Sequence, residues 1–488
     1  MNKDNLEQDR QAGAPSLLAR GAAGMTAAAK TAAPLTQAMA EFALGTHVFP
    51  PLARARALDA VTDCVACMFA GSREPLAGPL RIVLPSAPSP GEALHSVLVG
   101  TGRFAAPADA ALFNGTLAHA LDYDDTNHPG YAHPSSVLVS TLLALAPVAP
   151  FTGQDLIGAY IVGFEIFGKL GRAMNTQHYK RGWHATATLG AIASAVVAGR
   201  VLRLDRRQMT MALGIAASAA SGLRANFGSM VKPLHAGYAA RNGVLAALLA
   251  REGFDASAES IEHDFGYLHV FNDGIGFDPA PLLALGESLE ILTRYGLALK
   301  AYPSCGATHT GIEAALALRG DCRDETIESV HAGVSEMAFS PLIHVMPNTP
   351  LEGKFSLHYC IAAALVFGEV NLATFTDEKV NDPRVRALIP RISMELEERL
   401  RDDGEFPAEV TVRLASGRQL TQFVPLAMGK PERWLSPERL RAKFDDCTAA
   451  FDAQSARAIY ESLRQLDSAV GVEGLLQGLQ AVPRQVSP

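Results

Sequence analysis

Residues 183–201, WHATATLGAIASAVVAGRV, consist mainly of alanine, glycine and aliphatic residues, with no proline among them. Apolar residues recur through this stretch at helical spacing, which predicts a buried helix. Its small side chains let neighbouring helix backbones approach closely. Stretches of similar character lie on both sides, at 52–69, 135–146, 155–173, 207–223 and 235–251, with Asp155 and Asp205 as predicted N-caps. The sequence therefore predicts a large helical domain.

The pattern changes near Pro279. We expect strands at 288–299 and 329–337, a helix at 308–319 between them, and a β-hairpin formed by 409–414 and 419–424. Val410, Val412 and Leu414 alternate in this hairpin and are expected to face inward. Helices return at 437–451 and 454–465.

These patterns predict a mainly α protein in which a large all-helical domain is interrupted by a smaller α+β lid domain. The expected divisions are a flexible leader at 1–30, the first part of the helical domain at 31–280, the lid at 281–426, and the rest of the helical domain at 427–488.

Composition excludes several classes of protein. The 488 residues include 42 Lys and Arg and 50 Asp and Glu, for a net charge of −8, so no basic footprint for nucleic acid or anionic membrane is present. A hydrophobic content of 48% excludes a disordered chain, and six irregularly spaced cysteines do not make a secreted disulfide scaffold. Neither a membrane span nor a secretory signal is apparent. We expect a cytoplasmic protein.

The densest polar cluster is NGTLAHALDYDDTNHPGYAHP at 114–134. His119 and Asp122 would share a face if the helix extends that far. A solvated helix end is one interpretation. Three others compete: a D-x-D-x-T phosphoaspartate loop like that of haloacid dehalogenases, a His/Asp metal site, and a metal-free acid/base site. The phosphoaspartate loop would need a preceding strand, whereas the residues before it look helical.

Four further clusters could bind an anion or move protons: YKRGWH at 179–184, SMVKPLHAG at 229–237, KAYPSCGATH at 300–309 and EGKFSLHY at 352–359. Each has an ordinary structural alternative, as a solvated turn, a surface lysine or a helix cap. In the second, Pro233 is expected to set Lys232 apart from a helix that begins near His235. Cys305 and His309 also permit a Cys–His nucleophile, although no cysteine-hydrolase signature accompanies them.

Other motifs are missing or weak. The sequence has no P-loop and no G-x-G-x-x-G after a strand, so no nucleotide cofactor is expected. Cys64 and Cys67 form one C-x-x-C within a predicted helix, where buried small residues are favoured over a redox or zinc site.

Together, the five clusters resemble, in order, the motifs of the MmgE/PrpD family, and the resemblance extends from about Thr36 onward. That family includes 2-methylcitrate dehydratases, cis-aconitate decarboxylases and iminodisuccinate epimerases. The resemblance implies a helical domain with an α+β lid, a homodimer, a small polycarboxylate substrate, and no metal or cofactor.

Carried over by position, the resemblance implies a site in which His133, Asp122, Lys300 and Tyr359 are catalytic. The substrate-binding residues that it implies are Thr126, His128, His184, Lys232, His235, Cys305 and His309. The lysines would neutralise substrate carboxylates and acidify the adjacent C–H, with His133 as the acid/base.

The resemblance leaves the reaction open. Asp124-Asp125 and Asn127-His128-Pro129 stand where 2-methylcitrate dehydratases carry an Asn and a Trp-rich stretch, which argues against a dedicated 2-methylcitrate dehydratase. We expect a lyase that removes water or CO2 from a di- or tricarboxylate. The alternatives are an epimerase that uses the same site and a non-catalytic carboxylate-binding protein.

Overall fold

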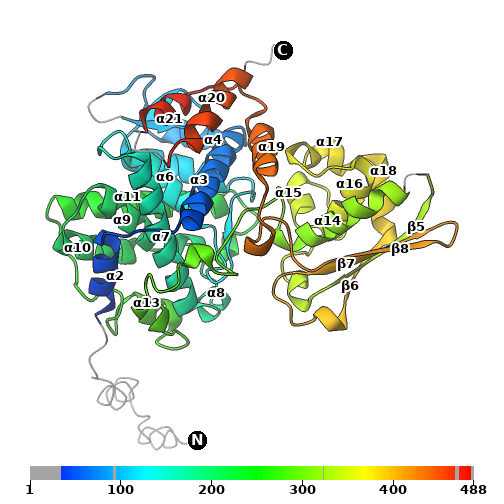
Figure 1. Cartoon of the computed structure of the whole chain (residues 1–488), viewed down its shortest axis with the longest axis horizontal. Coiled ribbons are helices and arrows are strands. Elements are labelled where there is room, and N and C mark those ends of the chain that lie inside the picture. Colours follow the sequence, from blue (N-terminus) through cyan, green and yellow to red (C-terminus); the bar gives the residue numbers. More distant parts are fainter. Residues whose placement is uncertain (1–33, 92–94, 323, 468–471, 485–488) are drawn as a thin grey trace, which may run out of the picture.

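The computed structural model describes residues 34–91, 95–322, 324–467 and 472–484, so the leader predicted at 1–30 lies outside the described residues. A body of helices lies beside a smaller body in which helices cover a sheet (Figure 1). The structure confirms a mainly α fold with a smaller α+β region. We call residues 302–424 the α+β region and the remainder the helical region.

The helical region is built around α9 (Ala185–Val201), which is buried along nearly its whole length. The other helices of eight or more residues before the α+β region are α2 (Leu35–Leu44), α3 (Pro51–Gly71), α5 (Pro107–His119), α6 (Pro134–Leu145), α7 (Gly153–Met174), α10 (Arg206–Ala219) and α11 (Val231–Arg251). Shorter helices are α4 (Ala77–Val83), α8 (Gln177–Lys180), α12 (Tyr267–Asn272) and α13 (Ala280–Leu283), and a small hairpin joins β1 (Ser96–Leu98) to β2 (Arg103–Ala105).

Glycines on α11 allow the close helix packing that the sequence predicts. A Cβ built on Gly237 would lie 2.3 Å from the carbonyl oxygen of Leu112 on α5, and one on Gly243 would lie 2.1 Å from Oγ of Ser194 on α9. Both distances are far below van der Waals contact, so α11 can lie against its two neighbours only because these side chains are absent.

The α+β region contains a four-stranded sheet in the order β6-β5-β7-β8. Its strands are β5 (Ile327–Val334), β6 (Ile392–Leu396), β7 (Ala408–Leu414) and β8 (Gln419–Val424). β5 and β6 run parallel and the other pairs are antiparallel, with Val412 opposite Leu420. The predicted hairpin is confirmed, and Val410, Val412 and Leu414 are buried.

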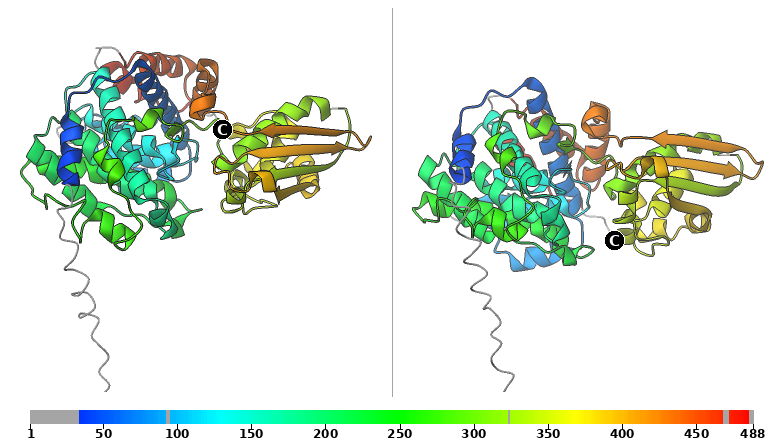
Figure 2. Two further views of the ribbon diagram at one scale, coloured as in Figure 1. Left: turned by 60° about the horizontal axis from the view of Figure 1, so that its bottom comes forward. Right: turned by 90° about the horizontal axis from the view of Figure 1, so that it is seen from below.

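Helices cover one face of this sheet (Figure 2). The α-helices of this region are α14 (His309–Leu318), α15 (Pro350–Lys354), α16 (Leu357–Phe367), α17 (Asp377–Val380) and α18 (Pro383–Leu388), and of these α14 and α16 pack directly on the strands. A separate hydrophobic core lies between the sheet and helices α14 and α16.

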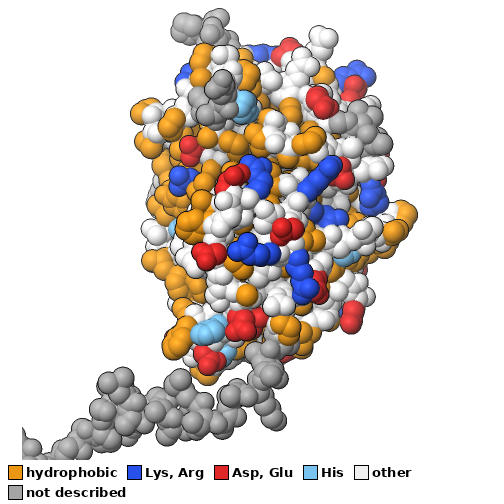
Figure 3. All heavy atoms as spheres, turned by 90° about the vertical axis from the view of Figure 1, so that its left-hand side faces the viewer, with side chains coloured by type: hydrophobic (Ala, Val, Ile, Leu, Met, Phe, Trp, Pro, Cys, Tyr) orange, Lys and Arg blue, Asp and Glu red, His pale blue; other side chains and the backbone are white. Residues whose placement is uncertain are grey.

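After the sheet the chain returns to the helical region through α19 (Pro437–Thr448), α20 (Ala453–Arg464) and α21 (Glu473–Gly478). Phe444 and Phe451 join the same core as Phe69 on α3, and the Phe69 and Phe451 rings meet edge to face at 4.9 Å. The face of the helical region turned away from the α+β region carries basic and acidic side chains interspersed among apolar ones (Figure 3).

Three local predictions are wrong. The strand expected at 288–299 is reduced to β4 (Leu297–Ala298), which pairs with β3 (Thr126–Asn127). Residues before it form a 3-10 turn, because buried Glu290 binds the Arg172 guanidinium at 2.8 and 3.0 Å. The N-cap of α7 is Thr152, and Asp155 completes its capping box at N3, whereas Asp205 is an N-cap as predicted.

The third correction concerns Lys232. Helix α11 begins at Val231, so Lys232 belongs to its first turn and is not set apart by Pro233. Proline is tolerated there because the first-turn N–H groups have no intrahelical acceptor. None of the helices in the described residues has both the length and the apolarity that crossing a membrane requires.

Candidate active site

A cavity of about 560 Å³ lies between the two regions of the protein. The α+β region contributes Met337, Ile343, Phe355 and Phe406 to its wall. Nine of the residues implied by the resemblance line it from both sides: Asp122, Thr126, His128, His133, His184, Lys232, Lys300, Cys305 and His309.

Asp122 stands between two lysines in the loop that follows α5. Its Oδ1 accepts from Nζ of Lys232 at 2.6 Å, and its Oδ2 accepts from Nζ of Lys300 at 2.7 Å. Its backbone has φ of +54°, a left-handed conformation that side chains other than glycine rarely adopt. Burial opposes ionisation, but the two ammonium groups outweigh it and hold the pKa of Asp122 well below its usual range. The pKa of Lys232 is raised in turn, because Asp122 outweighs burial.

Asp124 connects two imidazoles beside this triad. It accepts from Nδ1 of His119 at 2.9 Å and lies 3.5 Å from Nδ1 of His133, while Nε2 of His133 lies 3.9 Å from Asp122. His133 precedes α6, and its backbone N–H donates to Oγ1 of Thr186 at 3.1 Å. Helix α5 ends at His119, so His119 pairs with Asp124 and not, as the predicted helical face would have it, with Asp122.

Burial determines the protonation state of His133. It lowers the pKa of this imidazole to about 3 against the opposing effect of Asp124, so His133 is neutral at pH 7 and able to accept a proton. Burial would also raise the pKa of Asp124, but the neighbouring imidazoles His119 and His133 reverse this and lower it. A carboxylate therefore lies next to a neutral imidazole at the cavity wall.

Two more histidines extend the array. His184 stacks on His119 with ring centroids 5.8 Å apart, and its Nδ1 lies 3.1 Å from Nδ1 of His235. Burial, followed by the nearby His119, lowers the pKa of His184. His235 contacts the array through His184 but is not part of the cavity wall.

The structure does not bring Tyr359 to the cavity. This residue lies in the first turn of α16 inside the core of the α+β region, and its hydroxyl donates to the carbonyl oxygen of Thr374 at 2.5 Å. Burial raises the pKa of Tyr359 well above its usual range, which further separates it from a role as proton carrier near pH 7.

The geometry does not favour a Cys–His nucleophile either. Burial and then Asp122 raise the pKa of the Cys305 thiol, so the thiolate that would attack is disfavoured. Nε2 of His309 lies 3.3 Å from the carbonyl oxygen of Ser304. The phosphoaspartate interpretation is excluded by its context, because the loop follows helix α5 and not a strand. Cys64 and Cys67 are buried within α3, as predicted.

A metal ion has one possible donor set among the described residues. Ligand atoms of His119, Asp124 and His133 all lie within 4.8 Å of one another. One of these is already engaged, since Nδ1 of His119 hydrogen-bonds Asp124. A metal would have to replace that bond or use the second ring nitrogen, Nε2, which is buried and unpartnered.

Several residues near the site are absent from the set implied by the resemblance. Arg224 lines the cavity, with its guanidinium 3.7 Å from the centre of the Tyr179 ring. Lys354 and Lys443 are buried behind the wall and donate to backbone carbonyls of the loop that carries Asp122. The sequence alone seldom indicates that a lysine is buried. Lys354 could have been found because it lies in the polar cluster at 352–359, whereas nothing in the sequence singled out Lys443.

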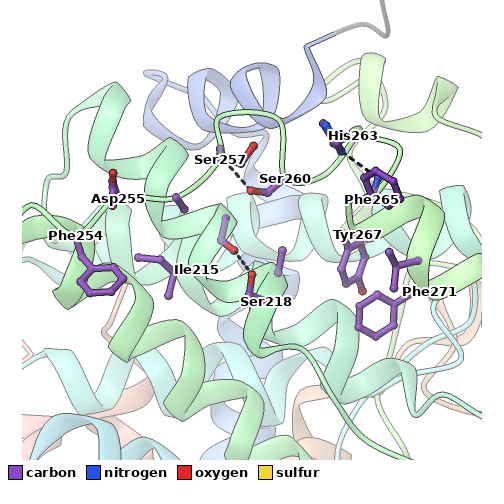
Figure 4. A pocket seen from close by; sticks show the side chains of 15 residues that line it. Ile215, Ser218, Phe254, Asp255, Ser257, Ser260, His263, Phe265, Tyr267 and Phe271 are labelled. Atoms are coloured by element: carbon purple, nitrogen blue, oxygen red, sulfur yellow. Dashed lines mark hydrogen bonds between the residues drawn. The ribbon is translucent and has the colours of Figure 1, made fainter. Parts of the chain in front are cut away.

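A second hollow, of about 770 Å³, lies between α10 and residues 254–271. Phe254 and Phe265 stand at its two ends with Ser218 and Ser260 between them (Figure 4). Its wall contains no lysine or arginine, so it lacks the charges that the carboxylate chemistry needs, and the cavity around Asp122 is the candidate active site.

The chain, whose helical body and α+β partner enclose this Lys/His/Asp cavity, belongs to the MmgE/PrpD family. The model of the MmgE/PrpD N-terminal domain matches residues 37–280, and that of the C-terminal domain matches residues 302–468.

Curated relatives are similar over most of their length. A cis-aconitate decarboxylase from Aspergillus terreus is 28% identical over 89% of this chain and 93% of its own. The Homo sapiens cis-aconitate decarboxylase is 29% identical over 69% and 72%. A 2-methylcitrate dehydratase from Cupriavidus necator is 26% identical over 65% and 70%. These relatives are lyases named for polycarboxylate substrates.

Proposed function

We propose that this protein is a lyase that needs no cofactor and removes CO2 or water from a small di- or tricarboxylate. The observation that carries the proposal is the convergence of Lys232 and Lys300 on Asp122 at the cavity wall, beside the neutral imidazole of His133. On the cavity wall the cationic side chains outnumber the acidic ones, Asp122 and Glu405, and this excess suits an anionic substrate; the cations are Arg224, Lys232, Lys300 and Lys430.

The residues have complementary roles in this proposal. The ammonium groups of Lys232 and Lys300 bind a substrate carboxylate and stabilise the negative charge that develops on the carbon beside it. In loss of water, His133 takes the proton from that carbon, the electron pair of the C–H bond forms a C=C bond, and the hydroxyl on the next carbon leaves as water with the proton that His133 gives back. In loss of CO2, the electron pair of the broken C–C bond remains on the carbon, which then takes a proton that His133 passes on from solvent. Asp124 stabilises the imidazolium form in either case.

The relatives' names favour decarboxylation of a cis-aconitate-like substrate, with dehydration of a methylcitrate-like substrate next. The epimerase alternative gains no support from the relatives described above. A proton NMR screen in D2O over citrate, 2-methylcitrate, cis-aconitate and iminodisuccinate distinguishes the reactions. Itaconate indicates decarboxylation, a new alkene with loss of water indicates dehydration, and solvent exchange without net loss indicates epimerisation.

The site assignment is tested by His133→Ala and Lys232→Ala. Each is expected to lower kcat/KM by at least about 100-fold, the usual scale for one positioned acid/base group. Lys379→Met, on α17 and against the Phe367 ring, is the control and should behave as the parent protein does. Full turnover by both site variants would show that the assignment is wrong.

Two features implied by the resemblance are part of the proposal. We expect activity to survive EDTA; loss with EDTA and recovery with Mg²⁺ or Zn²⁺ would instead favour a metal at His119, Asp124 and His133. We expect a homodimer, and light scattering at micromolar concentration tests it.

A further inference from the structure

Three consecutive backbone carbonyls around Asp122 each accept a hydrogen bond from a different buried lysine. The carbonyl oxygen of Leu121 accepts from Lys354 at 2.8 Å, that of Asp122 from Lys300 at 2.8 Å, and that of Tyr123 from Lys443 at 2.7 Å. The lysines come from α15, from the segment after β4 and from α19. Elements distant in the sequence thus meet at one tripeptide.

Lys354 differs from the other two in its charge balance. Lys300 pairs with the carboxylate of Asp122, and Lys443 pairs with Asp63 at 2.5 Å. In the described part of the chain no carboxylate makes an ion pair with Lys354, although only 7% of this residue is exposed. Burying a lysine without an ion-pair partner lowers the stability of the folded protein, so we expect Lys354 to have a role that compensates for this cost.

The charge of Lys354 depends on groups from several elements. Burial lowers its pKa to about 8, the carboxylates of Glu74 and Asp122 oppose this, and the ammonium groups of Lys300 and Lys232 add to it. The ammonium form predominates at pH 7, where its hydrogen bond to Leu121 is strongest because the donor is charged.

The hydrogen bond from Lys354 to Leu121 lies in the same turn that gives Asp122 its left-handed backbone conformation. A left-handed conformation is strained for an aspartate and persists only where its surroundings fix it. The backbone of Lys354 also contacts the cavity wall, because its carbonyl oxygen accepts from the N–H of Cys305 at 2.9 Å. Lys354 therefore contacts both the loop that carries Asp122 and the loop that carries Cys305.

We propose that Lys354 is a positioning residue: by donating from the α+β region to the carbonyl oxygen of Leu121, it holds the turn that places the Asp122 carboxylate between Lys232 and Lys300. The active site is then fully assembled only when α15 is docked against the loop at 121–123. The activity arm of the test rests on the proposed function, and the exchange arm does not.

The experiment compares Lys354→Met, Lys354→Arg and the control Lys379→Met in the full chain. Lys354→Met keeps the length of the stem and removes the donor. We expect its kcat to fall at least about tenfold with KM within threefold of the parent value, because misplacing reacting groups by about 1 Å costs up to about 100-fold. Lys354→Arg should recover most of this loss, and Lys379→Met should show none.

Hydrogen exchange of the peptide spanning residues 119–125 provides a readout that needs no turnover. It should become faster in Lys354→Met and stay at the parent rate in Lys379→Met. Unchanged kcat or unchanged exchange in Lys354→Met would overturn the inference, as would equal losses in Lys354→Met and Lys354→Arg with melting temperatures lowered in both. If the parent protein turns over no polycarboxylate, the proposed function fails, and the exchange comparison still decides the role of Lys354.

Discussion

The carboxylate of Asp122 balances two ammonium groups at once, so it supports both the stability of the loop and the chemistry of the cavity. Its low pKa in the folded state contributes stability that is present above the unfolded pKa of about 3.9 and is lost as the pH falls through the folded value. At neutral pH this contribution is complete.

Removing this charge should therefore be costly. We expect Asp122→Asn to lower the free energy of unfolding by about 3–5 kcal/mol in urea titrations at pH 7, because Lys232 and Lys300 would be left buried without their partner.

An exposed ion pair provides the matched control. Glu461 pairs with Arg457 on the surface of α20, and Glu461→Gln should cost no more than about 0.5 kcal/mol. Equal losses in the two variants would contradict the role assigned to Asp122.

At the residue scale, the sequence predicted which residues line the cavity better than it predicted which of their side chains contact one another. Nine of the eleven implied residues meet at one cavity, because short motifs carry both the residue types and the turns that present them. Which carboxylate pairs with His119 depends on where α5 ends. Because the helix ends at His119, the side chain of Asp122 binds the two lysines, and Asp124 is the carboxylate that hydrogen-bonds the His119 imidazole. A helix end without a proline or glycine signal is hard to locate from sequence.

At the scale of elements, α11 places Lys232 at the cavity because it lies close against α5 and α9. Gly237→Ala should lower the free energy of unfolding by about 1–3 kcal/mol, because the added methyl group would overlap the carbonyl oxygen of Leu112. Denaturant titration monitored by far-UV circular dichroism measures this.

Gly78→Ala on α4 is the control for this substitution. Its Cβ would have nothing within 4 Å, and alanine is the better helix former, so we expect no loss or a gain of about 0.5 kcal/mol. A loss in Gly78→Ala as large as that in Gly237→Ala would mean that close packing of α11 is not the cause.

The elements also indicate what local patterns can predict. The hairpin of β7 and β8 was predictable because alternation and a Ser-Gly turn are both local signals. The stretch at 288–299 looked like a strand but lacks a partner along most of its length, and the buried contact between Glu290 and Arg172 on α7 fixes it as a turn. Such a distant contact has no local signature.

At the scale of the whole molecule, buried histidines should make stability depend on pH. Burial lowers the pKa of His133 and His309 to about 3 and that of His178 to about 4, against about 6.5 in an unfolded chain. Below pH 6.5 the unfolded state therefore binds more protons than the folded state, and stability falls as the pH falls. Each group contributes up to about 1.4 kcal/mol per pH unit in this window.

The free energy of unfolding of His309→Gln should fall less steeply between pH 6.5 and 5 than that of the parent protein, by about 1 kcal/mol per pH unit. His178→Gln, at a residue that does not line the cavity, should reduce the slope by a similar amount. Comparing each variant with the parent cancels the contributions of the acids, and a slope unchanged in both would contradict the prediction.

The path of the chain also orders events during its synthesis. Lys443, on α19, donates to the carbonyl oxygens of both Tyr123 and Lys300, so the loop that carries Asp122 is completed by a residue 320 positions after Tyr123. A ribosome releases the N-terminal helices long before α19. The nascent protein can therefore bury most of its N-terminal helices while the loop that carries Asp122 still lacks Lys443, and this loop gains its last buried lysine only after α19 has been translated.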